Sequence, residues 1–129
     1  MSGRRLPECP AKPNCVSTQS TDPEKRMPAL TFDGGAELVR AAILDVLART
    51  RGARVVKAEE DYIHAEFTTL LFRFVDDVEF AIDPVARRVD FRSASRVGHS
   101  DLGTNRRRME GLTRRLEGVA GLAVAREGG

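Results

Sequence analysis

The chain has few aromatic residues and no long apolar segment. It contains no tryptophan and a single tyrosine in 129 residues, so its core must consist of aliphatic residues and phenylalanine. No apolar run approaches the roughly 18 residues that a membrane-spanning helix needs. The first residues, MSGRRLPECPAKPNC, lack the apolar segment of a secretory signal peptide. We therefore expect a protein that makes no membrane contact and resides in the cytoplasm.

Cysteine and histidine are scarce, with two of each. Cys9 and Cys15 lie in a proline-rich stretch, and a reducing cytoplasm disfavours a disulfide between them. Because a zinc site needs four ligands, the sequence favours two reduced thiols, with redox or metal use as the alternative, and it predicts no cofactor. His99 precedes Ser100 and Asp101, but neighbours in sequence do not have the geometry of a catalytic triad.

Positive charge is concentrated in one part of the chain. The net charge is +2, which is too small to indicate a nucleic-acid-binding protein by itself. Residues 96–115, however, hold six arginines against two acidic residues, which gives a local charge of +4. Such a stripe raises the local concentration of anions whatever the overall charge.

Prolines and apolar periodicity divide the chain into segments. The first 31 residues hold five of the six prolines, and proline lacks the N–H that helices and central strands need. Apolar residues at helical spacing predict one helix over 36–51, ended by Gly52, and a second over 102–117. The expected organisation is an extended proline-rich arm at 1–31, a single α+β domain at 32–125 and a frayed tail at 126–129.

Four segments show the alternation of apolar and polar residues that marks half-buried strands. They are residues 53–59, 62–68, 71–83 and 87–95. In the third segment, the residues expected on the buried face are Phe72, Phe74, Val78, Phe80 and Ile82. If the segments pair as consecutive hairpins, Glu66 lies opposite Arg73 and Glu79 lies opposite Arg92.

These elements predict an α+β fold with two layers. Two helices cover one face of a four-stranded antiparallel meander, in the order helix, four strands, helix, preceded by the arm. The alternative is a curved, helix-grip-like sheet with a cavity between the sheet and its C-terminal helix. The last segment, GVAGLAVAREGG, is typical of a short additional strand before a frayed end.

The stretch RSASRVGHSDLGTNRRR, from Arg92 to Arg108, predicts the position of a binding site. It joins the end of a strand to the start of a helix, where unpaired N–H groups bind anions. Arginine binds oxyanions through paired hydrogen bonds, and serine adds further donors. The candidate ligand-binding residues in this stretch are Arg92, Ser93, Ser95, Arg96, Ser100, Asp101, Asn105 and Arg106.

A structural interpretation of the same stretch stays open. In this interpretation Ser100 or Asp101 caps the helix and Arg92 pairs with Glu79. The remaining arginines then form a solvated helix face. Both interpretations place the stretch at the junction between strand and helix.

Two consecutive carboxylates, Asp76 and Asp77, complete the candidate site. Strict alternation points Asp76 into the core, which is costly unless the carboxylate is paired. We expect either a β-bulge that turns it outward or a buried partner such as Arg92, Arg96 or Asn105. Together with Glu79, the two aspartates are an alternative site for a hard cation, although structural pairing is favoured.

The sequence predicts a non-catalytic binding domain rather than an enzyme. Its ligand is a small anionic or polar molecule, or an acidic protein surface, held by the arginine-rich loop and the helix N-terminus. One alternative is a small enzyme in which Asp76 or Asp77 acts as acid or base beside Arg92 and Arg96. Another is nucleic-acid binding through the Arg106–Arg115 stripe, which is disfavoured because the sheet lacks exposed aromatic residues for base stacking.

Four segments, CPAKPNCVST, DYIHAEF, FRFVDDVEF and FRSASRVGHSDLGTNRRR, together resemble the bacterial and plastid family known as domain of unknown function 1499. The resemblance extends over 9–116, and the last segment is the most specific. The family has no established activity to carry over to this chain. Its motif positions fall here on Cys9, Pro10, Pro13, Asn14, Cys15, Asp76, Asp77, Arg92, Ser93, Ser95, Arg96, Gly98, Ser100, Asp101, Gly103, Asn105 and Arg106.

The resemblance draws the N-terminal arm and the 92–106 segment into one place. This chain departs from the family pattern at His99, where relatives often have tyrosine or another residue, and this departure argues against His99 as a catalyst. Many relatives also carry an export or membrane segment before the CP motif. In relatives that work outside the cytoplasm, a disulfide between the paired cysteines is expected more than it is here.

Overall fold

The computed structural model describes residues 4–69, 73–98 and 100–125, and these contain seven strands and two helices. The strands are β1 Cys15–Ser17, β2 Leu30–Phe32, β3 Ala53–Ala58, β4 Tyr62–Thr68, β5 Val75–Asp83, β6 Arg88–Ser95 and β7 Leu122–Val124. The helices are α1 Ala36–Ala48 and α2 Thr104–Leu116. Phe72, His99 and the tail at 126–129 lie outside the described residues.

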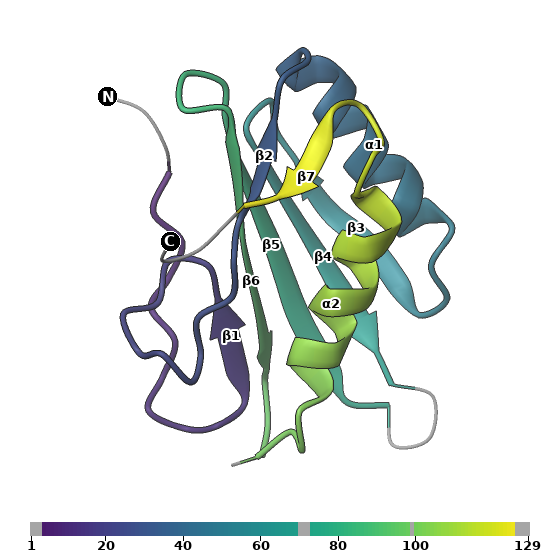
Figure 1. The fold of residues 1–129 in the computed structure, drawn as a ribbon. Coiled ribbons are helices and arrows are strands. Elements are labelled where there is room, and N and C mark those ends of the chain that lie inside the picture. The colour runs from purple at the N-terminus through teal and green to yellow at the C-terminus, as the bar shows by residue number, and fades with distance from the viewer. Residues whose placement is uncertain (1–3, 70–72, 99, 126–129) are drawn as a thin grey trace.

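The sheet is open and has seven strands rather than the expected four. Its strand order is β3-β4-β5-β6-β2-β7, and β1 also pairs with β6, so that β1 and β2 share one edge of β6 (Figure 1). All the named strands pair in antiparallel fashion. Of the three additional strands, β1 lies in the expected arm and β2 at the end of it, whereas β7 lies in the segment GVAGLAVAREGG, where a short strand was expected. Each has three residues, which is too short to show an alternation pattern.

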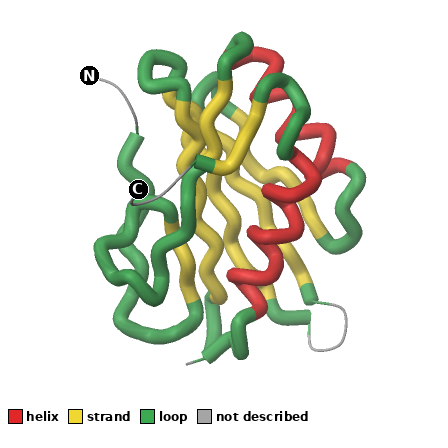
Figure 2. Tube along the Cα trace, in the orientation of Figure 1, coloured by secondary structure: helices red, strands yellow, loops and turns green. Residues whose placement is uncertain are grey.

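Both helices pack on one face of the sheet, which confirms the α+β class (Figures 1 and 2). Apolar residues at helical spacing supply the buried face of each helix. The buried residues are Val39, Ile43, Val46 and Leu47 in α1, and Met109, Leu112 and Leu116 in α2. They join one core with Phe80 and Phe91 of the sheet. Because these side chains fill the layer between α2 and the sheet, the structure favours two packed layers over the helix-grip alternative.

The N-terminal arm covers part of the opposite face. Leu6 is buried, and Arg4 forms ion pairs with Glu59 and Asp61, both at 3.1 Å. The guanidinium of Arg4 also lies over the ring of Tyr62, 4.7 Å from its centroid. Figure 2 shows that the arm consists mostly of loop. These contacts make the arm a part of the fold and not a free extension.

The expected register is right in one hairpin and wrong in the other. Glu79 lies opposite Arg92, as the alternation predicted. Glu66 lies opposite Asp77 and not opposite Arg73, because a turn delays the start of β5 to Val75. In this turn Arg73 has a positive φ of 56°.

The same turn corrects the expected position of Phe74. Its N–H donates to Thr69 Oγ1 and its carbonyl accepts from the N–H of Thr69, which closes the turn before the strand begins. The side chain of Phe74 is therefore 50% exposed and not buried. Val78, Phe80 and Ile82 are buried as expected.

Cys9 and Cys15 are joined by a disulfide, so the interpretation as two reduced thiols is wrong for this structure. Cys15 lies in β1, where it is buried opposite Ala94 of β6. The bond thus ties the CPAKPNC loop of the arm to the sheet. The sequence argument relied on the expected cellular compartment, and it did not consider that β1 holds one of the two cysteines in place.

We expect Cys9→Ser to lower the free energy of unfolding by about 2 kcal/mol, because the open chain gains entropy when a loop of this length is released. Urea denaturation of the variant and of the wild type measures this difference. Reduced wild type should match Cys9→Ser. An equal stability of the oxidised and reduced wild type would show that the bond does not stabilise the fold.

Candidate functional site

The sheet separates the expected site residues between its two faces. Side chains alternate along β5 and β6, so Asp76, Ser93 and Ser95 face the helices. Asp77 and Arg92 face away from them, as does Arg96 immediately after β6. Asp76 is therefore on the opposite face of the sheet from Asp77, Arg92 and Arg96, and these four residues do not line one cleft.

On the helix side, Asn105 of α2 is the centre of a buried polar network. Its Nδ2 lies 2.9 Å from Ser95 Oγ and 2.7 Å from Asp101 Oδ2. Its Oδ1 accepts hydrogen bonds from Ser93 Oγ at 2.5 Å and from Arg108 Nη1 at 2.8 Å. Asn105 and Ser93 are both fully buried, so these bonds satisfy polar groups that water does not reach.

The arm enters the same network through Asn14. Its carbonyl oxygen accepts hydrogen bonds from Asn105 Nδ2 at 3.2 Å and from the N–H of Ser95 at 3.0 Å. Its side-chain Nδ2 donates to the carbonyl of Gly98 at 2.9 Å. The arm and the 92–106 segment, which the family resemblance drew together, are thus in direct contact.

Asp76 is buried, and its partner is Arg108. The carboxylate is only 3% exposed, and its Oδ2 accepts a hydrogen bond from Arg108 Nη2 at 2.6 Å. The pairing of β5 with both neighbours is continuous through this position, so no β-bulge turns Asp76 outward. The guanidinium of Arg108 also lies over the ring of Phe67. The partner is therefore none of the three residues expected from the sequence.

Asp101 occupies the anion position at the start of α2. Its Oδ1 accepts from the N–H of Gly103 at 2.8 Å, and its Oδ2 accepts from the N–H of Asn105 at 3.1 Å. Burial raises the pKa of the Asp101 carboxyl, but the hydrogen bonds from Asn105 and Gly103 outweigh this effect and hold it below its usual value. The helix begins at Thr104, two residues later than expected, and the chain itself supplies the anion there.

On the opposite face, Arg96 is engaged by carboxylates. It bonds to Asp77 through Nε at 2.8 Å and to Glu66 through Nη2 at 2.7 Å. His64 Nε2 lies 2.7 Å from the other oxygen of Asp77. The hydrogen bond from Arg96 lowers the pKa of the Asp77 carboxyl, against the raising effect of burial.

Arg92 is part of a second polar group on that face. It lies 3.4 Å from Glu79 Oε1, and its Nη2 donates to the carbonyl of Glu8 in the arm. The hydroxyl of Tyr62 donates to Glu79, and burial together with this bond raises the pKa of Tyr62. Arg92 thus pairs with Glu79, as the structural interpretation of this residue expected, and it also joins the sheet to the arm.

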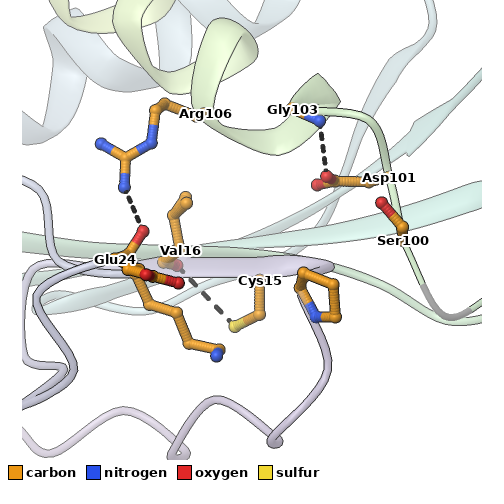
Figure 3. A pocket seen from close by; sticks show the side chains of 9 residues that line it. Cys15, Val16, Glu24, Ser100, Asp101, Gly103 and Arg106 are labelled. Atoms are coloured by element: carbon orange, nitrogen blue, oxygen red, sulfur yellow. Dashed lines mark hydrogen bonds between the residues drawn. The ribbon is translucent and has the colours of Figure 1, made fainter.

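A cavity of about 230 Å³ lies between the arm and the start of α2 (Figure 3). In Figure 3, Arg106 extends from α2 towards Glu24, and Asp101 and Ser100 lie on the other side. Of the expected site residues, the cavity brings together Ser100, Asp101 and Arg106. The residues that line it are Pro13, Cys15, Val16, Glu24, Lys25, Ser100, Asp101, Gly103 and Arg106.

The electrostatics of this cavity depend on which charges have partners. Lys25 Nζ lies 3.1 Å from Asp22 Oδ2, and Asp101 is bound by N–H donors. Arg106 donates through Nη2 to the carbonyl oxygen of Glu24 at 2.7 Å, and no described carboxylate pairs with it. Glu24 also lines the cavity and carries a carboxylate of its own. Arg106 is therefore the positive charge in the cavity that an anionic group can still bind.

The hard-cation alternative does not fit the arrangement of the carboxylates. Asp76 faces the helices, whereas Asp77 and Glu79 lie on the other face of the sheet. Among residues 4–69, 73–98 and 100–125, no group of three or more His, Cys, Asp or Glu side chains is placed to hold a metal ion.

Sequence reasoning missed two residues that matter here. Arg108 lies three positions after Asn105 and four before Leu112, so the helical period already placed it on the buried face. Lys25 lies in the arm, where no periodic signal points to it. Its place in the cavity depends on β1, which the sequence pattern does not predict.

A family model described as Protein of unknown function (DUF1499) matches residues 5–116, which is most of the chain. No curated protein and no solved structure matches this chain. Within the part of the chain that the structure describes, neither helix is long and apolar enough to cross a membrane.

Arg108→Met should lower the free energy of unfolding by about 3–5 kcal/mol, because it leaves Asp76 buried and unpaired. Urea denaturation measures the loss. Asp76→Val in the same background removes the orphaned charge and should restore part of the stability. Exposed ion pairs contribute less than about 1 kcal/mol to stability. A loss this small for Arg108→Met alone would contradict a stabilising role of the ion pair between Asp76 and Arg108.

The lowered pKa of Asp77 predicts a specific loss of stability in acid. A carboxyl group with a lower pKa in the folded state stabilises the protein above its unfolded pKa of about 3.9, and this contribution disappears as the pH falls through the folded pKa. Asp77→Asn should therefore be less stable at neutral pH and lose less stability below about pH 4. Free energies of unfolding measured between about pH 2 and pH 7 test this prediction. Arg96→Gln should also reduce the dependence of the unfolding free energy on pH below about pH 4.

Proposed function

The chain belongs to the DUF1499 family, and we propose that it is a non-catalytic binding domain whose ligand is a small anionic or polar molecule. The proposed binding site is the cavity between the arm and the start of α2. The observation that carries the proposal is Arg106, which lines this cavity and pairs with no described carboxylate. An anionic group bound there would complete its hydrogen bonding.

The other lining residues support the same ligand class. Ser100 adds a hydroxyl group, and Lys25 also lines the cavity although it is paired with Asp22. Asp101 is held in place by backbone N–H groups and fixes the start of the helix that carries Arg106. Six of the nine lining residues fall on motif positions of the family pattern, namely Pro13, Cys15, Ser100, Asp101, Gly103 and Arg106.

Binding is favoured over acid–base catalysis because of the state of the two aspartates. Asp76 is held in a buried ion pair with Arg108. Asp77 lies on the opposite face with its pKa lowered by the hydrogen bond from Arg96, and a carboxylate with a low pKa is a weak general base. Neither aspartate lines the proposed cavity.

The disulfide between Cys9 and Cys15 opposes the cytoplasmic location that the sequence pattern predicted, because such bonds persist in oxidising compartments. Alkylation of Cys9 and Cys15 in intact cells tests the location: free thiols fit the cytoplasm, whereas a bonded pair contradicts it.

A thermal-shift screen with sulfate, carboxylic acids and nucleotides should identify a ligand that raises Tm. At a ligand concentration of a hundred times Kd, stabilisation of about 2.7 kcal/mol is expected. Arg106→Ala should lose this stabilisation, because it removes the unpaired guanidinium from the cavity. The matched control is Arg114→Ala, which removes an exposed arginine of the same helix that does not line the cavity. An equal ligand response in Arg106→Ala and wild type would place the binding site elsewhere.

A further inference from the structure

A second hollow, of about 350 Å³, lies on the other flank of α2. It is bounded by α2, by the turn between α1 and β3, and by the end of β4, and we call it the arginine groove. It shares no lining residue with the cavity proposed above. The polar residues that line it are Thr50, Arg51, Thr68, Arg107, Arg108 and Arg115.

The arginine groove has four guanidinium groups and no carboxylate among its described lining residues. Arg108 is neutralised by Asp76. Arg107 donates to the carbonyl oxygen of Leu102, and Arg115 donates to Thr50 Oγ1 at 2.8 Å, so both use neutral acceptors.

Arg51 completes this set. Its side chain is exposed, and no described residue forms a hydrogen bond or ion pair with it. Three positive charges around one hollow thus lack a negative partner. A bound anion would supply the negative partner that these groups lack.

We infer that the arginine groove binds a small molecule that carries two or more linked phosphate groups. Guanidinium groups match phosphate oxygens in charge and in hydrogen-bond geometry. A diphosphate or triphosphate carries several negative charges on one compact group, which corresponds to the three uncompensated arginines better than a single carboxylate does.

The shape of the groove favours a small ligand over a nucleic acid. Its volume lies at the lower end of the range of small-molecule sites. Phe67 is the aromatic residue that lines it, but Phe67 is only 6% exposed and Arg108 lies over its ring at 4.9 Å. A nucleic-acid base therefore finds no exposed ring for stacking, and base stacking supplies much of the affinity for single strands.

Gly111 offers a direct way to close the groove. It lies in α2 among the lining residues, and a Cβ added to it meets no atom within 4 Å. Gly111→Ala should therefore fold and leave the groove open. Gly111→Glu should also fold, but its carboxylate would neutralise the arginines and compete with the phosphate groups.

The test is calorimetric titration of the oxidised wild type with inorganic tripolyphosphate and pyrophosphate. Physiological ionic strength is used, because screening then limits charge effects to about 8 Å. We expect saturable binding with one site per chain. Arg51→Ala should raise Kd about tenfold, which is the effect of one lost hydrogen bond to a charged group. Gly111→Glu should abolish binding, whereas Gly111→Ala should bind as the wild type does.

Two control variants distinguish binding in the arginine groove from a general response to positive charge and from binding in the cavity. Arg114→Ala removes the same unit of charge as Arg51→Ala from outside the groove, so it should leave Kd unchanged. Arg106→Ala should also leave tripolyphosphate binding unchanged, although it removes the ligand response proposed for the cavity. The proposal for the cavity and the proposal for the arginine groove can thus be contradicted separately.

Three results would overturn the inference. The first is the absence of saturable tripolyphosphate binding to the wild type. The second is equal weakening by Arg51→Ala and Arg114→Ala, which would mean that the ions respond to overall charge alone. The third is tighter binding of a single-stranded oligonucleotide than of tripolyphosphate, with a steep dependence on salt, which would assign the arginines to a nucleic-acid backbone.

Discussion

The arrangement of this protein depends on the buried polar network around Asn105 and the ion pair between Asp76 and Arg108. These groups connect α2 to β5, β6 and the arm at positions that water does not reach. Apolar side chains tolerate small shifts, but a shifted helix would leave Asn105 and Asp76 buried without partners, which is costly. The network therefore fixes α2 on the sheet in one position and one rotation.

This fixed position determines what the exposed residues of α2 can do. With Asn105 pointing into the network, Arg106 extends to the cavity at the arm, while Arg107 and Gly111 lie at the groove on the other flank. The polar composition of the 92–108 segment thus has two physical causes. Ser93, Ser95 and Asp101 serve the network, whereas Arg106 and Arg107 are left without carboxylate partners.

The periodicity of the sequence predicted which side chains of β5 face the core and how β5 pairs with β6. Alternation along the third predicted strand placed Asp76 inside and Glu79 opposite Arg92, and both are correct. The register between β4 and β5 was not predictable, because it depends on where the 69–74 turn closes. A shift by an even number of residues keeps the same side chains on the same face, so the hydrophobic pattern does not detect it.

The arginines show where composition alone misleads. A cluster of arginines suggests a binding site, yet Arg92, Arg96 and Arg108 are each engaged by a carboxylate. The sequence does not reveal this, because the partners Glu79, Asp77 and Asp76 lie on another strand and alternate between two faces. The arginines that remain able to bind an anion are those that the fold leaves with neutral acceptors or none. Partner availability, and not density along the chain, distinguishes a binding arginine from a structural one, and both candidate sites of this protein follow from that distinction.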